Sequence, residues 1–149
     1  MNLTTIRKQL EIDEGCVYEI YLDHLGYPTF GIGHLITEED QEYGQPVGTP
    51  VSEDRVQEAF DKDIAVAIVD VEKIYGLEEF YSWPQEVQEI LVNMAFNLGR
   101  TRLSKFVNFR KALKERDWSK AAHEMRDSKW FYQVGDRSFR LYSRMKEVK

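Results

Sequence analysis

The stretch EIDEGCVYEIYLDHLGYPTFGIGH, residues 11–34, changes its pattern at Gly15. Apolar residues before this glycine have helical spacing, and Thr4 or Thr5 can cap the helix that they predict. After the glycine, short runs rich in Val, Ile, Tyr and Phe are separated by the segment LDHLGYP, which contains residues that favour a turn. The stretch therefore predicts a helix that ends near Gly15 and a small hairpin-based sheet that ends near Leu35.

The rest of the chain is mainly helical in pattern. Thr37 can cap a short helical turn in TEED, and residues 43–51 are dense in Gly and Pro and predict a loop. Apolar positions then recur every three or four residues from Ser52 to Ile74, which predicts a long amphipathic helix.

A nearly continuous apolar face between Val87 and Leu98 predicts a central, buried helix that stops at Gly99. Ser82 and Gln85 have the spacing of a capping box before it. We expect further helices at 106–113, 118–127 and 138–149.

This order of elements predicts a single α+β domain with two lobes. The sheet lobe covers residues 15–51 approximately, and the larger helical lobe is formed by residues 1–14 and 52–149. The long helix that starts at Ser52 would join the lobes, and a cleft between them would be a natural ligand site.

Composition excludes several classes of protein. The chain has 149 residues, of which 42% are hydrophobic, enough to fold around one core without disulfides or a metal. Cys16 is the only cysteine, and the three histidines are scattered, so no disulfide or metal site is expected. The net charge of −6 argues against nucleic-acid binding. No signal peptide and no membrane-spanning run is apparent, so we expect no stable membrane association.

The segment from Pro28 to His34 predicts a strand with almost no side chains on one of its faces. Alternation would place Thr29, Gly31 and Gly33 together on that face. Glycines in a strand often mark the close approach of a ligand or another backbone, and they also mark bulges and packing contacts. The strand pattern leaves both interpretations open.

Two carboxylates border this strand in the sequence, Glu14 at the predicted helix end and Asp23 in the predicted turn. Glycosidic bond cleavage needs one protonated and one ionised carboxyl group. The helix-end dipole favours a neutral Glu14, whereas a solvated turn favours an ionised Asp23. Because the chain contains 26 acidic residues, ordinary solvated surface is the competing interpretation.

The sequence resembles the phage-type lysozymes. The resemblance is densest in IDEG and IYLDHLGYPTFGIGH, and it continues through EAFDKDIAVA, NMAFNLG, WSKAA, SKW and GDRSFR. It implies an inverting muramidase in which Glu14 is the general acid and Asp23 is the second catalytic carboxylate. Thr29 would help to hold the attacking water.

The same resemblance implies roles for other residues. Arg137 would pair with Glu14, Arg140 with Asp13, and His34 with Asp63 as a structural ion pair. The residues implied in substrate binding are Gly33, Phe96, Asn97 and Trp130. Core packing is the alternative interpretation of Phe96 and Trp130, and for Trp130 it is at least as good.

The resemblance also implies a substrate and a cellular setting. We expect a monomer without a cofactor that cuts bacterial peptidoglycan, is held in the host cytoplasm, and needs a separate membrane-permeabilising protein to reach the wall. Two alternatives are a lytic transglycosylase and a lysozyme-like module that binds glycan without cutting it. Many relatives are basic, whereas this chain is acidic, so attraction to an anionic wall would depend on the basic residues in 100–120 and 137–149.

Overall fold

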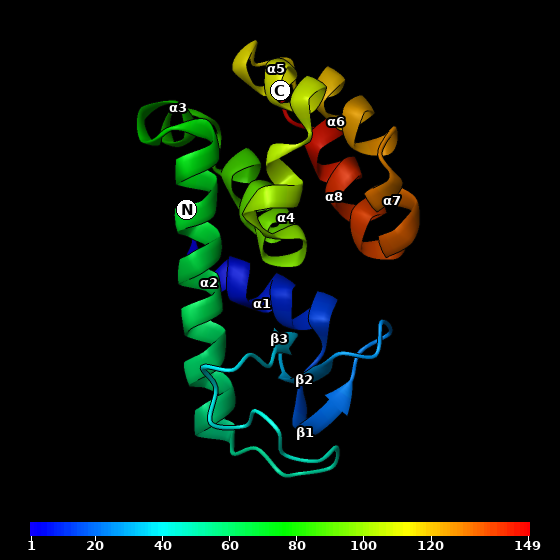
Figure 1. Ribbon diagram of the computed structural model, residues 1–149. Helices are drawn as coiled ribbons and strands as arrows, with labels where there is room; N and C mark the ends of the chain where they lie inside the picture. Colours follow the sequence, from blue (N-terminus) through cyan, green and yellow to red (C-terminus); the bar gives the residue numbers. More distant parts are fainter. The chain divides into compact units, whose positions relative to one another are not determined.

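The computed structural model describes residues 1–149 and contains eight α-helices and one three-stranded antiparallel sheet (Figure 1). This confirms the predicted α+β class. The elements in chain order are α1 (Leu3–Glu14), β1 (Val17–Leu22), β2 (Pro28–Gly31), β3 (His34–Leu35), α2 (Glu53–Tyr75), α3 (Leu77–Ser82), α4 (Gln85–Ser104), α5 (Val107–Lys114), α6 (Trp118–Arg126), α7 (Lys129–Val134) and α8 (Asp136–Lys146).

The chain forms two compact units. Unit 1 consists of Met1–Ile6 and Val66–Lys149, and unit 2 consists of Arg7–Ala65. Both boundaries fall inside helices, so unit 2 contains the end of α1, the whole sheet and the first half of α2.

The sheet of unit 2 has the strand order β1-β2-β3, with Tyr21 opposite Thr29 and Thr29 opposite Leu35. The prediction of one strand from 28 to 34 is wrong in its second half. The backbone enters the left-handed region at Gly31 and Gly33, both at φ +64°, and the residues between β2 and β3 form a tight turn. The face predicted for Thr29, Gly31 and Gly33 therefore does not exist as a continuous strand face.

The connection from β3 to α2 is a loop, but its first part differs from the prediction. Thr37 does not cap a helical turn. Instead the Asp40 carboxylate accepts a hydrogen bond from the Thr37 backbone N–H at 2.8 Å, and the chain forms a single turn there. The end of the loop lines the free edge of β1, where the Ile20 N–H donates to the Thr49 carbonyl at 2.9 Å.

The caps at two helix starts differ from the predictions. The Asn2 side chain accepts a hydrogen bond from the Thr5 backbone N–H at 3.1 Å, so Asn2 caps α1 in place of the two threonines. Pro84 precedes α4 without any side-chain cap, so the predicted capping box is wrong. The Ser82 hydroxyl donates instead to the Glu79 carbonyl at 2.6 Å.

The core of unit 1 surrounds α4, which is buried along most of its length as predicted. Gly99 lies at φ +79° and breaks the helix, and one further turn follows it. The helix α8 packs against α4, α6 and α7. The short helices α3 and α7 were not predicted. None of the helices combines the length and the apolar character needed to cross a membrane.

Candidate active site

Glu14 is the last residue of α1 and lies partly buried against the turn between β2 and β3. Gly15 follows at φ +74° and ends the helix. A Cβ atom on Gly33 would stand 2.9 Å from the Glu14 carboxyl carbon, closer than real Cβ atoms approach. A side chain at position 33 would therefore require the Glu14 carboxyl group to shift from this place. The bare position at Gly33 accommodates a side chain of the protein itself.

Asp23 is fixed in the turn that joins β1 to β2. Its Oδ1 atom accepts hydrogen bonds from the backbone N–H groups of Leu25 and Tyr27, both at 2.9 Å. Asp23 is partly buried, and its other carboxylate oxygen accepts no hydrogen bond from the protein. The turn thus orients the carboxylate and leaves one oxygen for another partner.

Thr29 and Asp23 are joined through one peptide carbonyl. The Tyr27 carbonyl accepts from the Asp23 backbone N–H at 2.9 Å and from the Thr29 hydroxyl at 2.9 Å. Thr29 is only 4% exposed. Because its proton is directed to Tyr27, the Thr29 oxygen offers lone pairs to any further partner, as a hydroxyl can donate only once.

Tyr21 belongs to the same group of residues, although sequence reasoning missed it. It lies opposite Thr29 in the β1–β2 register. Burial, followed by the negative charges of Glu14 and Asp23, raises the pKa of the Tyr21 hydroxyl. Both carboxylates therefore lie within electrostatic reach of one phenol. The available signal was its place near the end of the strand that leads into the Asp23 turn.

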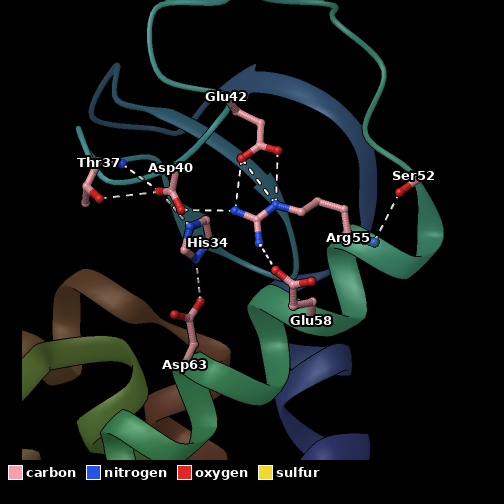
Figure 2. Close-up of polar contacts among 8 residues, drawn as sticks. All are labelled: His34, Thr37, Asp40, Glu42, Ser52, Arg55, Glu58 and Asp63. Carbon is pink, nitrogen blue, oxygen red and sulfur yellow. Dashed lines mark hydrogen bonds and ion pairs between the residues drawn. The ribbon is translucent and has the colours of Figure 1, made fainter.

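His34 lies between two carboxylates (Figure 2). Its Nδ1 atom lies 2.7 Å from Asp63 Oδ2, which is the contact that the resemblance implied, and its Nε2 atom lies 2.9 Å from Asp40 Oδ2. The ring packs on Phe30 with a centroid separation of 4.8 Å. Sequence reasoning missed Asp40 and its partner Arg55, because side-chain contacts across a loop leave no periodic pattern.

The implied substrate-binding residues of unit 1 form a second group. The Trp130 indole N–H donates to Asn97 Oδ1 at 2.7 Å, and the Trp130 ring packs near Phe106 at 6.3 Å. Trp130 is only 2% exposed, whereas Phe96 and Asn97 are partly exposed. Asn97 therefore keeps its amide NH2 group for a further partner, while Trp130 packs as a core residue.

Arg137 is buried and held by α4. Its Nε atom donates to Asn93 Oδ1 at 2.9 Å, and a terminal nitrogen reaches the Asn93 carbonyl at 3.3 Å. Sequence reasoning did not identify Asn93. Arg137 and the exposed Arg140 belong to unit 1, whereas their implied partners Glu14 and Asp13 belong to unit 2. Those two pairings stay predictions.

The chain resembles known lysozymes over most of its length. The family model Phage lysozyme matches residues 11–147. Two proteins of Dictyostelium discoideum, named probable T4-type lysozyme 1 and 2, are 31% and 32% identical to it, each over 95% of this chain and 93% of its own length. The pre-baseplate central spike protein Gp5 of Enterobacteria phage T4 is 28% identical over 92% of this chain, which corresponds to 27% of that longer protein.

Proposed function

The chain belongs to the phage lysozyme family and is a lysozyme, a glycosidase whose substrate is peptidoglycan, and we propose that it is an inverting muramidase. It hydrolyses the β-1,4 bond between N-acetylmuramic acid and N-acetylglucosamine. Glu14 donates a proton to the departing oxygen, and Asp23 and Thr29 hold the water that attacks from the opposite face.

The contact that carries this proposal is the shared Tyr27 carbonyl. It fixes both the Asp23 backbone and the Thr29 hydroxyl, so that the two side chains keep one relative position. Each of them has acceptor capacity left over. A water that donates one hydrogen bond to each would direct an oxygen lone pair away from both, which is the orientation that nucleophilic attack requires.

Glu14 has the separate placement that an acid in an inverting enzyme needs. It comes from a helix end, whereas Asp23 and Thr29 come from the β1–β2 hairpin. Inversion requires a carboxyl separation of about 6.5–9.5 Å, so that a water fits between the second carboxylate and the sugar. Glu14 is partly buried, and its carboxyl group occupies the space beside Gly33.

Replacement of the acid tests the proposal. We expect Glu14→Gln to fold and to lose roughly 10²–10⁴-fold in the release of reducing ends from purified peptidoglycan, because positioned proton donation contributes about that factor. Glu11→Gln is the matched control, since Glu11 is an exposed residue of the same helix. Full activity in Glu14→Gln would refute the assignment.

A lytic transglycosylase is the second candidate, because that chemistry needs only one acid. It closes an internal anhydro ring and has no use for a bound water, so the paired Asp23 and Thr29 disfavour it. Mass spectrometry of the released muropeptides separates the two, since anhydro ends would support the transglycosylase. A non-catalytic module would bind sacculi without releasing any reducing ends.

The cellular role that we propose is lysis of a bacterial host from within. The protein acts as a monomer, and a separate membrane-permeabilising protein gives it access to the wall. Expression in a bacterial cytoplasm should therefore leave culture turbidity unchanged until a membrane-permeabilising agent is added. Clearing without that agent would contradict the dependence, and an oligomer in solution would contradict the monomer.

A further inference from the structure

We propose that Asp40 is a positioning residue for the proposed acid. Asp40 and Asp63 hold the His34 ring from its two sides, and His34 anchors the turn whose Gly33 supports the Glu14 carboxyl group (Figure 2). This inference rests on the proposed role of Glu14 and adds to it the means by which the acid is kept in place.

The contacts of His34 define its charge state. Both ring nitrogens face carboxylate oxygens, at 2.7 Å for Asp63 and 2.9 Å for Asp40. A neutral imidazole carries one N–H and can donate to only one of them. The imidazolium form donates to both, so this arrangement is complete only when His34 is protonated.

Asp40 is itself held from several directions. Its Oδ2 atom accepts from the Thr37 backbone N–H, and its Oδ1 atom lies 3.1 Å from the Arg55 guanidinium. Arg55 also forms a bidentate ion pair with Glu42. Its Nε atom donates to Oε2 at 3.0 Å, and a terminal nitrogen donates to Oε1 at 3.0 Å. The Asp40 side chain is 11% exposed. It therefore connects the loop after β3 to α2.

The charges around His34 favour its protonated form. Burial lowers the pKa of His34, but Asp63 from α2 and Asp40 from the loop outweigh that effect and raise it above its ordinary value. Arg55 is the opposing cation, and Glu42 and Glu58 face that guanidinium. Phe30 contributes only an uncharged ring from β2. As pH rises through the folded pKa, one carboxylate is left facing a ring nitrogen that no longer donates.

A change in the position of His34 can be transmitted to Glu14 through the peptide unit that joins His34 to Gly33. His34 directly follows Gly33, and the two residues start β3 and end the turn. The Glu14 carboxyl group occupies the space in which a side chain on residue 33 would begin. A shift of His34 therefore moves the surface on which the acid rests. Ionisation of the acid Glu14 itself lowers kcat as pH rises. We expect the protonation state of His34 to shift the pH at which this fall occurs, with little change in KM.

Asp40→Asn tests the coupling, because it keeps the shape of the side chain and removes its charge. The chain has only three histidines, so imidazole resonances can be titrated by NMR and assigned. We expect the His34 pKa to fall in Asp40→Asn. The alkaline limb of the kcat–pH profile, measured on soluble, uncrosslinked peptidoglycan chains, should move to lower pH together with the His34 pKa, with KM within about twofold. Glu39→Gln removes an exposed charge one residue away and should change neither quantity.

The inference would be overturned if the His34 pKa falls in Asp40→Asn while the alkaline limb of the kcat–pH profile stays at the same pH. If Asp40→Asn does not fold, Arg55→Met weakens the hold on Asp40 from the other side and should show a coupled shift of the His34 pKa and the alkaline limb. The outcome is separable from the proposed function. An inactive Glu14→Gln with an unmoved limb in Asp40→Asn defeats only this inference, whereas an active Glu14→Gln defeats the role of Glu14 itself.

Discussion

Unit 2 carries 14 acidic and four basic side chains, a net charge of −10, whereas unit 1 carries 12 acidic and 16 basic ones, a net charge of +4. Both units have an apolar core, which surrounds α4 in unit 1 and includes Ile20, Phe30 and Phe60 in unit 2. Unit 2 adds to this core the side-chain contacts to backbone and the ion pairs of Figure 2 that surround its short sheet.

The contrast bears on where the chemistry lies. The proposed reacting groups Glu14, Asp23 and Thr29 all belong to unit 2. Apolar packing is non-directional, and it tolerates rearrangement at fixed volume. Directional hydrogen bonds fix individual oxygen atoms. We infer that the proposed reacting groups of unit 2 determine the rate of the reaction and that the implied substrate-binding residues of unit 1 contribute mainly to binding.

The largest expected difference in activity between variants of the two units comes from replacing Asp23, the carboxylate proposed to hold the attacking water. Asp23→Asn keeps an oxygen for the Leu25 and Tyr27 N–H groups, so the hairpin should fold, but the negative charge is lost. We expect a loss of roughly 10²-fold or more in reducing-end release. Asn97→Ala in unit 1 removes the implied binding contact and also the acceptor of the Trp130 indole N–H. Activity per folded molecule should fall less than about tenfold, since a net hydrogen bond contributes about 1 kcal/mol. Similar losses in both variants would contradict the division of roles.

A second difference lies between two glycines of unit 2. Gly33→Ala places a methyl group against the Glu14 carboxyl group, whereas Gly44→Ala meets no atom within 4 Å. Both residues have positive φ, so each substitution should cost about 1–2 kcal/mol of stability. Only Gly33→Ala should also lose activity, by about tenfold or more. Thermal melts and turnover rates check this, and equal activity losses would show that Glu14 does not depend on Gly33.

The ion pairs of unit 2 predict a pH range of greatest stability. The folded pKa of His34 is raised, so its stabilisation is complete below about pH 6.5 and is lost as pH rises through that folded value. Hydrogen bonds from Arg55 lower the pKa of Glu42, so this contribution is present above about pH 4.3 and is lost at more acidic pH.

Asp63→Asn should reveal this range in melts between pH 3 and pH 10. We expect it to destabilise the protein by about 1–3 kcal/mol near pH 5–6, with a difference from wild type that shrinks as His34 deprotonates. A difference that is constant at all pH values above 6 would show that the protonation of His34 carries no stability.

The smallest expected effect comes from the opposite charges of the two units. Salt reduces the Debye length from about 30 Å at 0.01 M to about 8 Å at 0.15 M. If the repulsion between unit 2 and an anionic wall dominates, the clearing rate should rise about twofold over this range. A steep fall would show instead that the basic residues of unit 1 drive binding to the wall.

The sequence predicted best those elements that apolar periodicity determines. The buried helix α4, the long helix α2 that starts after Ser52, and the left-handed Gly15 follow from spacing and from backbone preferences. The helices α3 and α7 have six residues each, which is too short for periodicity to show. The end of the strand at Gly31 was missed because the alternating pattern of side chains continues past this residue in the sequence.

The candidate site likewise contains some residues that the sequence indicated and some contacts that it did not. Glu14, Asp23 and Thr29 were identified as residues, yet the Tyr27 carbonyl that joins two of them could not be foreseen, because backbone atoms are the same in every sequence. Asp40 and Arg55 lie 15 positions apart and meet only when the loop folds back onto α2. Such contacts depend on tertiary structure, and a single sequence does not record them.

The stereochemistry of the first product tests the central claim most directly. If Glu14 donates the proton and a water held by Asp23 and Thr29 attacks from the opposite face, NMR of the earliest reaction mixture should show reducing ends of the inverted α configuration. Reducing ends that first appear in the retained β configuration, or anhydro ends in their place, would contradict the direct attack of water on which the account depends.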